Sequence, residues 1–256
     1  MSRINKLALA SLTFAVLGLA AAMPVRADTV VYSNNFSSPP TVTGVSATLT
    51  GGQAQTSPNG QQFLQLHSDA QNANLTIGGL QANSLVTLSF NLYGIQSLDG
   101  NSPNFGQDNF NLNANGTTLL FASFSNGNPA TAAEGQTYGC PPGLSPCAPA
   151  TGASAINTLG YTFAGQVIGD STYNLSYTTN ADSSGVVVFS FFAFNLQPPG
   201  DESFGLDNIV VNGSTLSAPT AVPEPTTMLL LGTGLAGVAA KVHRRREIYK
   251  AENDVE

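Results

Sequence analysis

Acid–base and nucleophilic chemistry have few candidate residues in this sequence. The chain has two histidines, and His67 is the one that lies outside the C-terminal basic segment. A Ser–His–Asp arrangement would have to be built on His67, within Leu66-His67-Ser68-Asp69, and no G-x-S-x-G motif is present. A hydrogen-bonded loop histidine is the favoured interpretation. Catalytic zinc is not expected with so few ligands, so we predict no catalytic residue of these kinds.

Paired carboxylates are the remaining route to catalysis, because glycoside hydrolysis requires only two of them. Each acidic candidate lies in a Gly-, Asn-, Ser- or Pro-rich setting typical of turns, and no two have a diagnostic spacing. We therefore expect a protein that is not an enzyme, with a secreted glycoside hydrolase as a less favoured alternative. The candidates for that alternative are Asp99, Asp108, Glu134, Asp201, Glu202 and Asp207.

Basic residues are confined to the two ends of the chain. No Lys or Arg occurs between Ala27 and Ala240, whereas the stretch from Asp28 to Pro225 contains 11 acidic residues. Nucleic-acid binding needs cationic side chains that neutralise phosphates. The composition therefore excludes nucleic acid as a partner of this stretch.

The N-terminus has the three parts of a secretory signal peptide. Arg3 and Lys6 are followed by the uncharged apolar run Leu7–Ala22, and small residues surround Arg26 at its exit. The run is short for a permanent membrane helix. We predict a signal peptide over residues 1–27 and a mature chain that starts near Asp28.

A second apolar segment lies near the C-terminus. No charge occurs between Thr226 and Ala240, and Lys241 and three arginines follow. The length suits a transmembrane helix over residues 226–242. Lys and Arg remain on the cytoplasmic side of a membrane, which places residues 243–256 in the cytoplasm and the body of the protein outside. A buried globular helix is the less favoured alternative.

The residues around this segment resemble the PEP-CTERM sorting signal over about residues 221–246. Val222, Pro223, Glu224 and Pro225 come first, the apolar stretch follows, and Arg244, Arg245 and Arg246 end it. The resemblance implies recognition by an exosortase at the inner membrane, cleavage near the motif, and delivery to the cell surface or the extracellular matrix. The chain departs from the family in its acidic tail, Glu247–Glu256, because the family usually ends at its basic cluster.

Two cysteines flank a short Pro-rich loop. Cys140 and Cys147 are the only cysteines of the chain. In an exported protein we predict a local disulfide between them. A zinc site is less favoured, since no further cysteine or nearby histidine accompanies the pair.

The stretch between the two apolar segments has the pattern of an all-β domain. Short apolar or alternating runs recur with turn residues between them, and Asn115-Gly116 predicts a type I′ hairpin turn. Val186–Phe192 is predicted to be a central strand that is buried on both faces. We expect a two-sheet jelly-roll or β-sandwich. The expected strands are Thr29–Tyr32, Gly44–Leu49, Gln62–Leu66, Ala73–Ile77, Leu85–Tyr93, Asn109–Asn113, Thr117–Phe124, Tyr173–Thr178, Gly185–Phe194 and Leu206–Val211.

A weaker resemblance concerns this domain. The domain resembles exterior domains that are found ahead of PEP-CTERM signals, and the resemblance is carried by three segments, Tyr32–Phe36, Gly106–Gly116 and Phe204–Val211. Those exterior domains are similar to the jelly-roll sandwiches of carbohydrate-binding modules. The resemblance implies that the first and last strands lie side by side, sometimes joined by a structural calcium. Such an ion would be held by Asn35 and Asp207, with Asp201 or Glu202 nearby. Alternatively, Asp207 only caps or turns the chain.

The sequence thus predicts five segments: 1–27, the signal peptide; 28–215, the all-β exterior domain; 216–225, a Pro-rich linker; 226–242, the transmembrane helix; and 243–256, the cytoplasmic end. The expected function is that of a non-enzymatic surface or matrix protein associated with exopolysaccharide or biofilm. A carbohydrate-binding protein is the alternative. Such proteins often use aromatic platforms, for which Tyr93, Tyr138 and Tyr161 would have to serve because the chain has no Trp.

Overall fold

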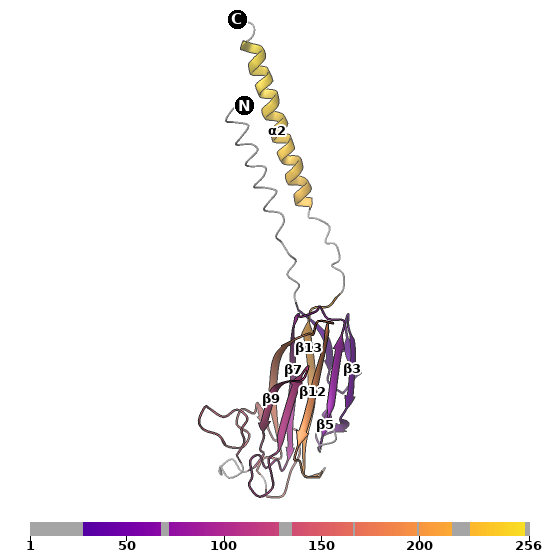
Figure 1. The fold of residues 1–256 in the computed structure, drawn as a ribbon, viewed down its shortest axis with the longest axis vertical. Coiled ribbons are helices and arrows are strands. Elements are labelled where there is room, and N and C mark those ends of the chain that lie inside the picture. The colour runs from indigo at the N-terminus through magenta and orange to yellow at the C-terminus, as the bar shows by residue number, and fades with distance from the viewer. Residues whose placement is uncertain are drawn as a thin grey trace. The chain divides into compact units, whose positions relative to one another are not determined.

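The structure, a computed structural model, describes residues 28–67, 72–127, 135–165, 167–198, 200–216 and 226–253. Within the last range, side chains are described for residues 231–246. The chain divides into two compact units, Met1–Leu216 and Ser217–Glu256. The described part of the first unit is a β-sandwich, and that of the second is one helix (Figure 1).

The larger sheet of the sandwich has eight strands. Its main path runs β10-β11-β7-β13-β1-β2, and β5 pairs with both β13 and β4. The pairings are antiparallel. The strands are β1 (Thr29–Asn34), β2 (Thr41–Val42), β4 (Gln53–Thr56), β5 (Gln62–Leu66), β7 (Leu85–Gln96), β10 (Ala155–Ile156), β11 (Asp170–Asn180) and β13 (Glu202–Gly213).

The smaller sheet has five strands in the order β3-β6-β12-β8-β9, which are also antiparallel. They are β3 (Ser46–Gly51), β6 (Ala73–Gly78), β8 (Asn109–Ala114), β9 (Thr117–Ser123) and β12 (Val186–Phe194). Together the two sheets confirm the predicted all-β, sandwich-like fold.

Phenylalanine rings join the two sheets across the core. Phe90 of β7 lies with its ring centroid 5.4 Å from that of Phe191 in β12 and 6.3 Å from that of Phe110 in β8. All three side chains are fully buried. Aromatic pairs at such distances stabilise a fold by about 0.5–1.5 kcal/mol beyond the area that they bury. The rings therefore fix how the sheets face each other.

The chain passes from one sheet to the other at Gly51 and Gly52, between β3 and β4. Both glycines have positive φ angles, 76° and 65°. A Cβ atom at Gly51 would lie 1.8 Å from the carbonyl oxygen of Asn72. Only glycine therefore fits this crossing.

Strand β13 changes its partner halfway along its length. Its first part pairs with β5, in the register Phe204↔Leu66, and its second part pairs with β1, in the register Ile209↔Asn34. An irregularity in its pairing with β7 lies between Asp207 and Val210. The predicted adjacency of the first and last strands is confirmed.

All ten predicted strands are present, and three short strands, β2, β4 and β10, were not predicted. The hairpin at Asn115-Gly116 is confirmed, with φ angles of 49° and 79°. The prediction that Val186–Phe192 is buried on both faces is wrong. Strand β12 is central, but its buried side chains alternate with half-buried ones, because the outer face of the smaller sheet is partly open to solvent.

Helix α2 covers Thr226–Asn253 and carries Arg244, Arg245 and Arg246. In the described part of the chain, no helix is both long and apolar enough to span a membrane. The predicted span over residues 226–242 is therefore not confirmed, and the helix runs on through the basic cluster instead of ending before it. The predicted signal peptide lies outside the described residues.

Candidate functional site

Three buried carboxyl groups meet at one end of the sandwich. Asp99, Asp108 and Glu202 each offer a carboxylate oxygen within 4.8 Å of those of the other two. The exposed fractions of their side chains are 7%, 1% and 0%. Among the described His, Cys, Asp and Glu residues, no other group of three is this close. We call these three residues the acidic cluster.

The strand pattern explains why two of these carboxyl groups point inward. Glu202 opens β13 two residues before the buried Phe204, and Asp108 precedes β8 two residues before the buried Phe110. Side chains two positions apart on an extended chain share a face. The rings of Phe110 and Phe204 lie 5.5 Å apart across the core, so the two carboxyl groups meet next to this pair.

Asp99 comes from the loop that follows β7. The end of β7 pairs with the start of β13, in the register Gln96↔Glu202. Asp99 forms an isolated bridge with Ser125, beyond β9. The backbone N–H groups of Asp99 and Gly100 both donate to Oδ2 of Asp108. The loop is thereby folded around the Asp108 carboxyl group.

Within the acidic cluster, Asp108 and Glu202 each have one carboxyl oxygen that accepts no hydrogen bond. Glu202 Oε2 accepts a 2.7 Å hydrogen bond from the backbone N–H of Gln197, and Asp108 Oδ2 accepts the two described above. Glu202 Oε1 and Asp108 Oδ1 are buried and have no hydrogen-bond partner. A buried acceptor left in this way normally costs about 1–3 kcal/mol, and more when it is charged.

Burial also makes the charged form of these groups unfavourable. Loss of hydration raises the pKa of Asp108 and of Glu202 above the usual range of carboxyl groups. The negative charge of Asp108 raises the pKa of Glu202 further, and that of Asp99 acts in the same direction on both. The cluster therefore favours a bound proton or a cation at this position.

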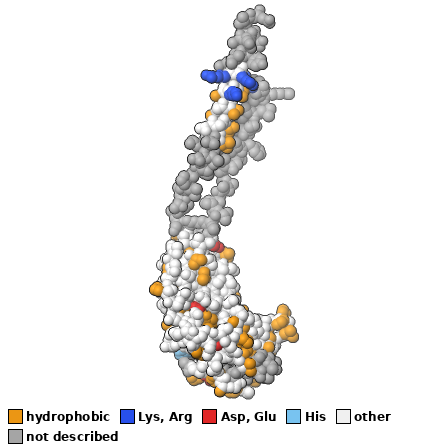
Figure 2. Space-filling view, turned by 180° about the vertical axis from the view of Figure 1, so that it is seen from behind, with side chains coloured by type: hydrophobic (Ala, Val, Ile, Leu, Met, Phe, Trp, Pro, Cys, Tyr) orange, Lys and Arg blue, Asp and Glu red, His pale blue; other side chains and the backbone are white. Residues whose placement is uncertain are grey.

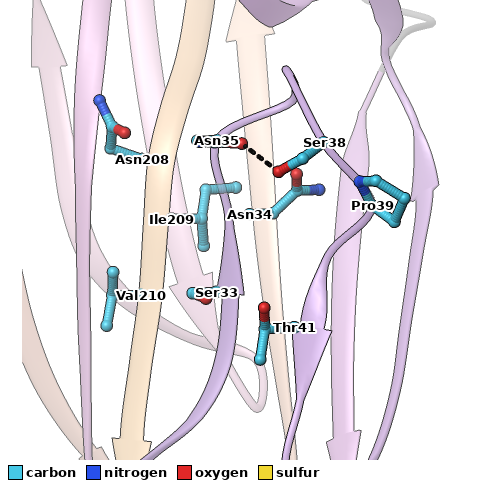
Figure 3. A pocket seen from close by; sticks show the side chains of 9 residues that line it. All are labelled: Ser33, Asn34, Asn35, Ser38, Pro39, Thr41, Asn208, Ile209 and Val210. Atoms are coloured by element: carbon cyan, nitrogen blue, oxygen red, sulfur yellow. Dashed lines mark hydrogen bonds between the residues drawn. The ribbon is translucent and has the colours of Figure 1, made fainter.

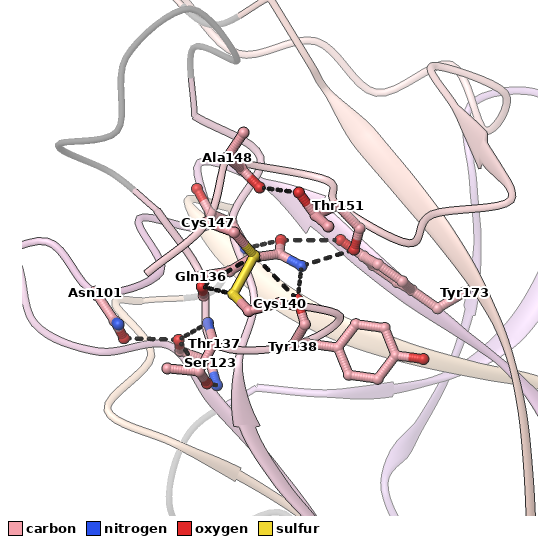
Figure 4. The surroundings of a disulfide bond; sticks show 11 residues. Asn101, Ser123, Gln136, Thr137, Tyr138, Cys140, Cys147, Ala148, Thr151 and Tyr173 are labelled. Atoms are coloured by element: carbon pink, nitrogen blue, oxygen red, sulfur yellow. Dashed lines mark hydrogen bonds between the residues drawn. A yellow bond between two sulfur atoms is a disulfide. The ribbon is translucent and has the colours of Figure 1, made fainter. Parts of the chain in front are cut away.

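The loops beside the acidic cluster are connected to the disulfide loop (Figure 4). The predicted bond between Cys140 and Cys147 is present. Buried Gln136 donates to the carbonyl oxygens of Tyr138 and Thr151 at 2.8 and 2.9 Å. Its Oε1 accepts from the backbone N–H of Ser125 at 3.2 Å. The disulfide loop and the acidic cluster thus share the Ser125 segment.

The two residues predicted to hold calcium belong to separate hydrogen-bond networks. Asp207 Oδ2 accepts 2.8 Å hydrogen bonds from the hydroxyl of Tyr93 and the side-chain amide of Gln61. Asn35 Oδ1 accepts a hydrogen bond from Ser38. Asp207 therefore joins β13 to β7 and to the start of β5, where β13 changes partner. This is a structural role, and the calcium prediction at these residues stays untested.

A polar pocket of about 280 Å³ lies beside this position, between β1, β13 and the loop after β1 (Figure 3). Its polar lining is uncharged and consists of amide and hydroxyl side chains. Asn208, which has a positive φ angle of 49°, contributes from β13. The lining residues are Ser33, Asn34, Asn35, Ser38, Pro39, Thr41, Asn208, Ile209 and Val210.

The remaining predicted candidates do not form a catalytic arrangement among the described residues. Glu134 lies outside those residues. Asp201 accepts a hydrogen bond from Ser97, and His67 Nδ1 is buried without a hydrogen-bond partner. Tyr93 is buried and cannot serve as an aromatic platform for a sugar.

The sequence did not single out the acidic cluster as a site. Asp99, Asp108 and Glu202 were among the six carboxylates considered for a catalytic pair, and Glu202 was also considered as a neighbour of the expected calcium. The Gly- and Ser-rich residues around them suggested turns, and no spacing linked the three. The available signal was the repeated pattern of an acid two positions before a core phenylalanine, at Asp108–Phe110 and Glu202–Phe204.

The sorting residues fall on both sides of the described boundary. Val222, Pro223, Glu224 and Pro225 lie outside the described residues. Arg244, Arg245 and Arg246 lie on α2 and are exposed. In the view of Figure 2, Lys and Arg side chains appear on the helix and not on the visible face of the sandwich.

Residues 221–246 match the PEP-CTERM protein-sorting motif. This motif implies export and processing by an exosortase. The match covers the predicted signal and confirms that resemblance. A search of curated proteins found no match for the chain.

Solved structures similar to the chain include latent PorU from Porphyromonas gingivalis, with 13% identity over 75% of this chain and a TM-score of 0.37. The chain spans 14% of the length of PorU. The C-terminal CBM6 of the laminarinase LamC from Zobellia galactanivorans has 9% identity, a TM-score of 0.30, and coverage of 73% of this chain and 100% of its own. The mannan-recognising module TmCBM27 has 15% identity and a TM-score of 0.32, and the match covers 74% of this chain and 100% of the module. At such TM-scores these likenesses carry no argument about what the chain binds.

Proposed function

We propose that the chain is a non-enzymatic surface or matrix protein that is anchored briefly in the inner membrane and released by an exosortase. The match of residues 221–246 to the sorting motif carries this proposal. The signal peptide starts export, helix α2 with its basic cluster holds the C-terminus, and cleavage near Val222–Pro225 frees the sandwich. The released domain then associates with exopolysaccharide in the extracellular matrix or biofilm.

The distribution of charge supports this proposal. The stretch from Asp28 to Pro225 has no Lys or Arg, whereas the C-terminal end carries five basic residues from Lys241 to Lys250. Basic side chains on one side of an apolar segment set its orientation in a membrane. The acidic exterior stays soluble through its negative charge.

Replacement of the motif tests the sorting step. Changing Pro223, Glu224 and Pro225 to alanine should leave the protein in the membrane fraction and abolish its release. Pro219→Ala, a matched proline substitution in the same linker, should not affect release. Normal release of the triple variant would contradict exosortase recognition at this motif.

The second candidate function is carbohydrate binding by the sandwich, and the polar pocket favours it. The pocket offers amide and hydroxyl groups and no charged side chain, which suits an uncharged ligand rich in hydroxyl groups. Its volume of about 280 Å³ lies just below the usual range of about 300–1,000 Å³ for small-molecule sites. This candidate does not depend on calcium.

Polysaccharide pull-down with the released protein tests whether the polar pocket is a carbohydrate-binding site. Binding that is lost in Asn35→Ala/Asn208→Ala and retained in Phe121→Ser would support the pocket. Phe121 is 60% exposed on the smaller sheet and serves as the matched control on the other face. Absence of any binding would contradict the second candidate function, carbohydrate binding in this pocket. A hydrolase activity abolished by replacing one acidic residue would overturn the non-enzymatic proposal.

A further inference from the structure

The domain that holds the acidic cluster contains no lysine and no arginine. No Lys or Arg occurs between Ala27 and Ala240, so no lysine or arginine of this domain can neutralise Asp108 or Glu202. Buried charges are normally paired or bound to a metal ion. The carboxyl groups of Asp108 and Glu202, which lie within 4.8 Å of each other and of Asp99, therefore need a proton or a cation, and no Lys or Arg of this domain can supply the cation.

The two unpartnered oxygens provide an independent indication. Asp108 Oδ1 and Glu202 Oε1 are buried and accept no hydrogen bond, although the second oxygen of each group is satisfied by backbone N–H groups. The backbone donors hold each carboxyl group in a defined orientation. The two carboxyl groups are near enough for a side-chain hydrogen bond with each other when one of them is protonated. Each remaining oxygen can therefore share a proton with the other group or bind a cation that replaces this proton.

We propose that Asp99, Asp108 and Glu202 bind one calcium ion that joins both sheets and the loop after β7 at this end of the sandwich. Calcium takes six to eight oxygen ligands in flexible geometry. Carboxylates from different loops and strands, which can bind through one or both oxygens, suit it better than magnesium, which demands a near-ideal octahedron. This inference goes beyond the proposed function, because it concerns the fold of the sandwich and not its sorting.

The position of the cluster defines what the ion would stabilise. Glu202 belongs to the larger sheet, and Asp108 lies at the start of β8 in the smaller sheet. The backbone N–H of Asn101, two residues after Asp99, donates to the carbonyl oxygen of Gly135 at 2.7 Å. An ion bound here would therefore hold together the sheets, the loop after β7 and the start of the disulfide loop.

Calcium titration of the full chain tests the inference. Isothermal titration calorimetry with Ca²⁺ should show one site per chain. The melting temperature measured in calcium at about 100 times the dissociation constant should be roughly 5–10 °C higher than the melting temperature measured in chelator. The double variant Asp108→Asn/Glu202→Gln should lose both effects. Asp182→Asn, a substitution at an exposed turn, and Asn35→Ala should retain them.

The outcomes are distinct. Absence of calcium binding and of a melting-temperature shift in the natural protein would overturn the inference, even if the double variant failed to fold. Loss of the shift in Asn35→Ala with its retention in the double variant would assign the ion to Asn35 and overturn the inference as well. A response to Mg²⁺ with none to Ca²⁺ would contradict calcium as the ligand.

Discussion

At the scale of single residues, buried carboxyl groups have two different solutions in this sandwich. Asp207 receives a tyrosine hydroxyl and a side-chain amide on one oxygen, and the backbone N–H of Asn208 on the other. Asp108 and Glu202 each keep one oxygen without a donor. The Asp207 carboxyl group is therefore satisfied by the protein itself, and removing the Tyr93 hydroxyl would take away one of its hydrogen-bond donors. The two unpartnered oxygens of the acidic cluster lack such donors, so the stability of the cluster depends on bound protons or cations.

The pH dependence of stability follows from this difference. In ion-free protein, burial raises the pKa of Asp108 and Glu202, so the folded chain keeps protons that the unfolded chain releases. This stabilising contribution is complete below the unfolded pKa of about 4 and is lost as the pH rises toward the raised values. In chelator, the melting temperature should therefore fall between pH 5 and pH 8.

The control for this prediction is Asp108→Asn/Glu202→Gln. Repulsion among the other acidic residues also grows with pH, so the fall in melting temperature should be smaller in the double variant than in the natural protein. Calcium should reduce the fall in the natural protein, because it binds the deprotonated carboxylates. If the melting temperature fell equally with pH in the two proteins in chelator, the pH dependence could not come from Asp108 and Glu202, and the prediction would be wrong.

At the scale of elements, the crossing between the two sheets depends on glycine. Gly51→Ala would place a Cβ atom 1.8 Å from the carbonyl oxygen of Asn72, at a φ angle of 76°. Gly60→Ala, at a φ angle of 94° with no atom within 4 Å, is the matched control. We expect the control to cost about 1–2 kcal/mol for its backbone conformation and Gly51→Ala to cost clearly more in urea unfolding. Equal losses of unfolding free energy in the two variants would contradict the steric requirement for glycine at position 51.

The disulfide loop gives a second prediction at this scale. Cys140 and Cys147 are 7 positions apart, and closing so short a loop stabilises the folded state by about 2–3 kcal/mol in the chain-entropy model. Replacing both cysteines with serine should lower the free energy of unfolding by about this amount. Reduction of the natural protein should have a similar effect, and an unchanged midpoint of denaturation would contradict it.

The strands were predictable because alternation and turn residues are local signals. Strand β4, Gln53–Thr56, has one apolar residue in four, and it was missed because it is held mainly by pairing with β5. The acidic cluster was missed for another reason. Its members come from two sheets and a loop, and no pattern along the chain shows that Glu202 meets Asp108. The burial of the strand with Val186 was overestimated, because a continuous apolar run does not reveal which face another layer covers.

At the scale of the whole molecule, the proposed function assigns the two ends of the chain to delivery and the sandwich to the product that is delivered. The sorting motif occupies residues 221–246, and the sandwich ends before it, at Leu216. Cleavage near Val222–Pro225 would therefore remove α2 and all basic residues of the mature chain. The product would be a purely acidic domain that keeps its disulfide and its acidic cluster.

Intact-mass measurement of the protein released from the cell surface tests this account most directly. We expect a chain that starts near Asp28, ends near Val222–Pro225, and is 2 Da lighter than its reduced form because the disulfide removes two hydrogens. A released chain that still contains Arg244–Glu256 would contradict processing by an exosortase and would leave α2 as a permanent part of the protein.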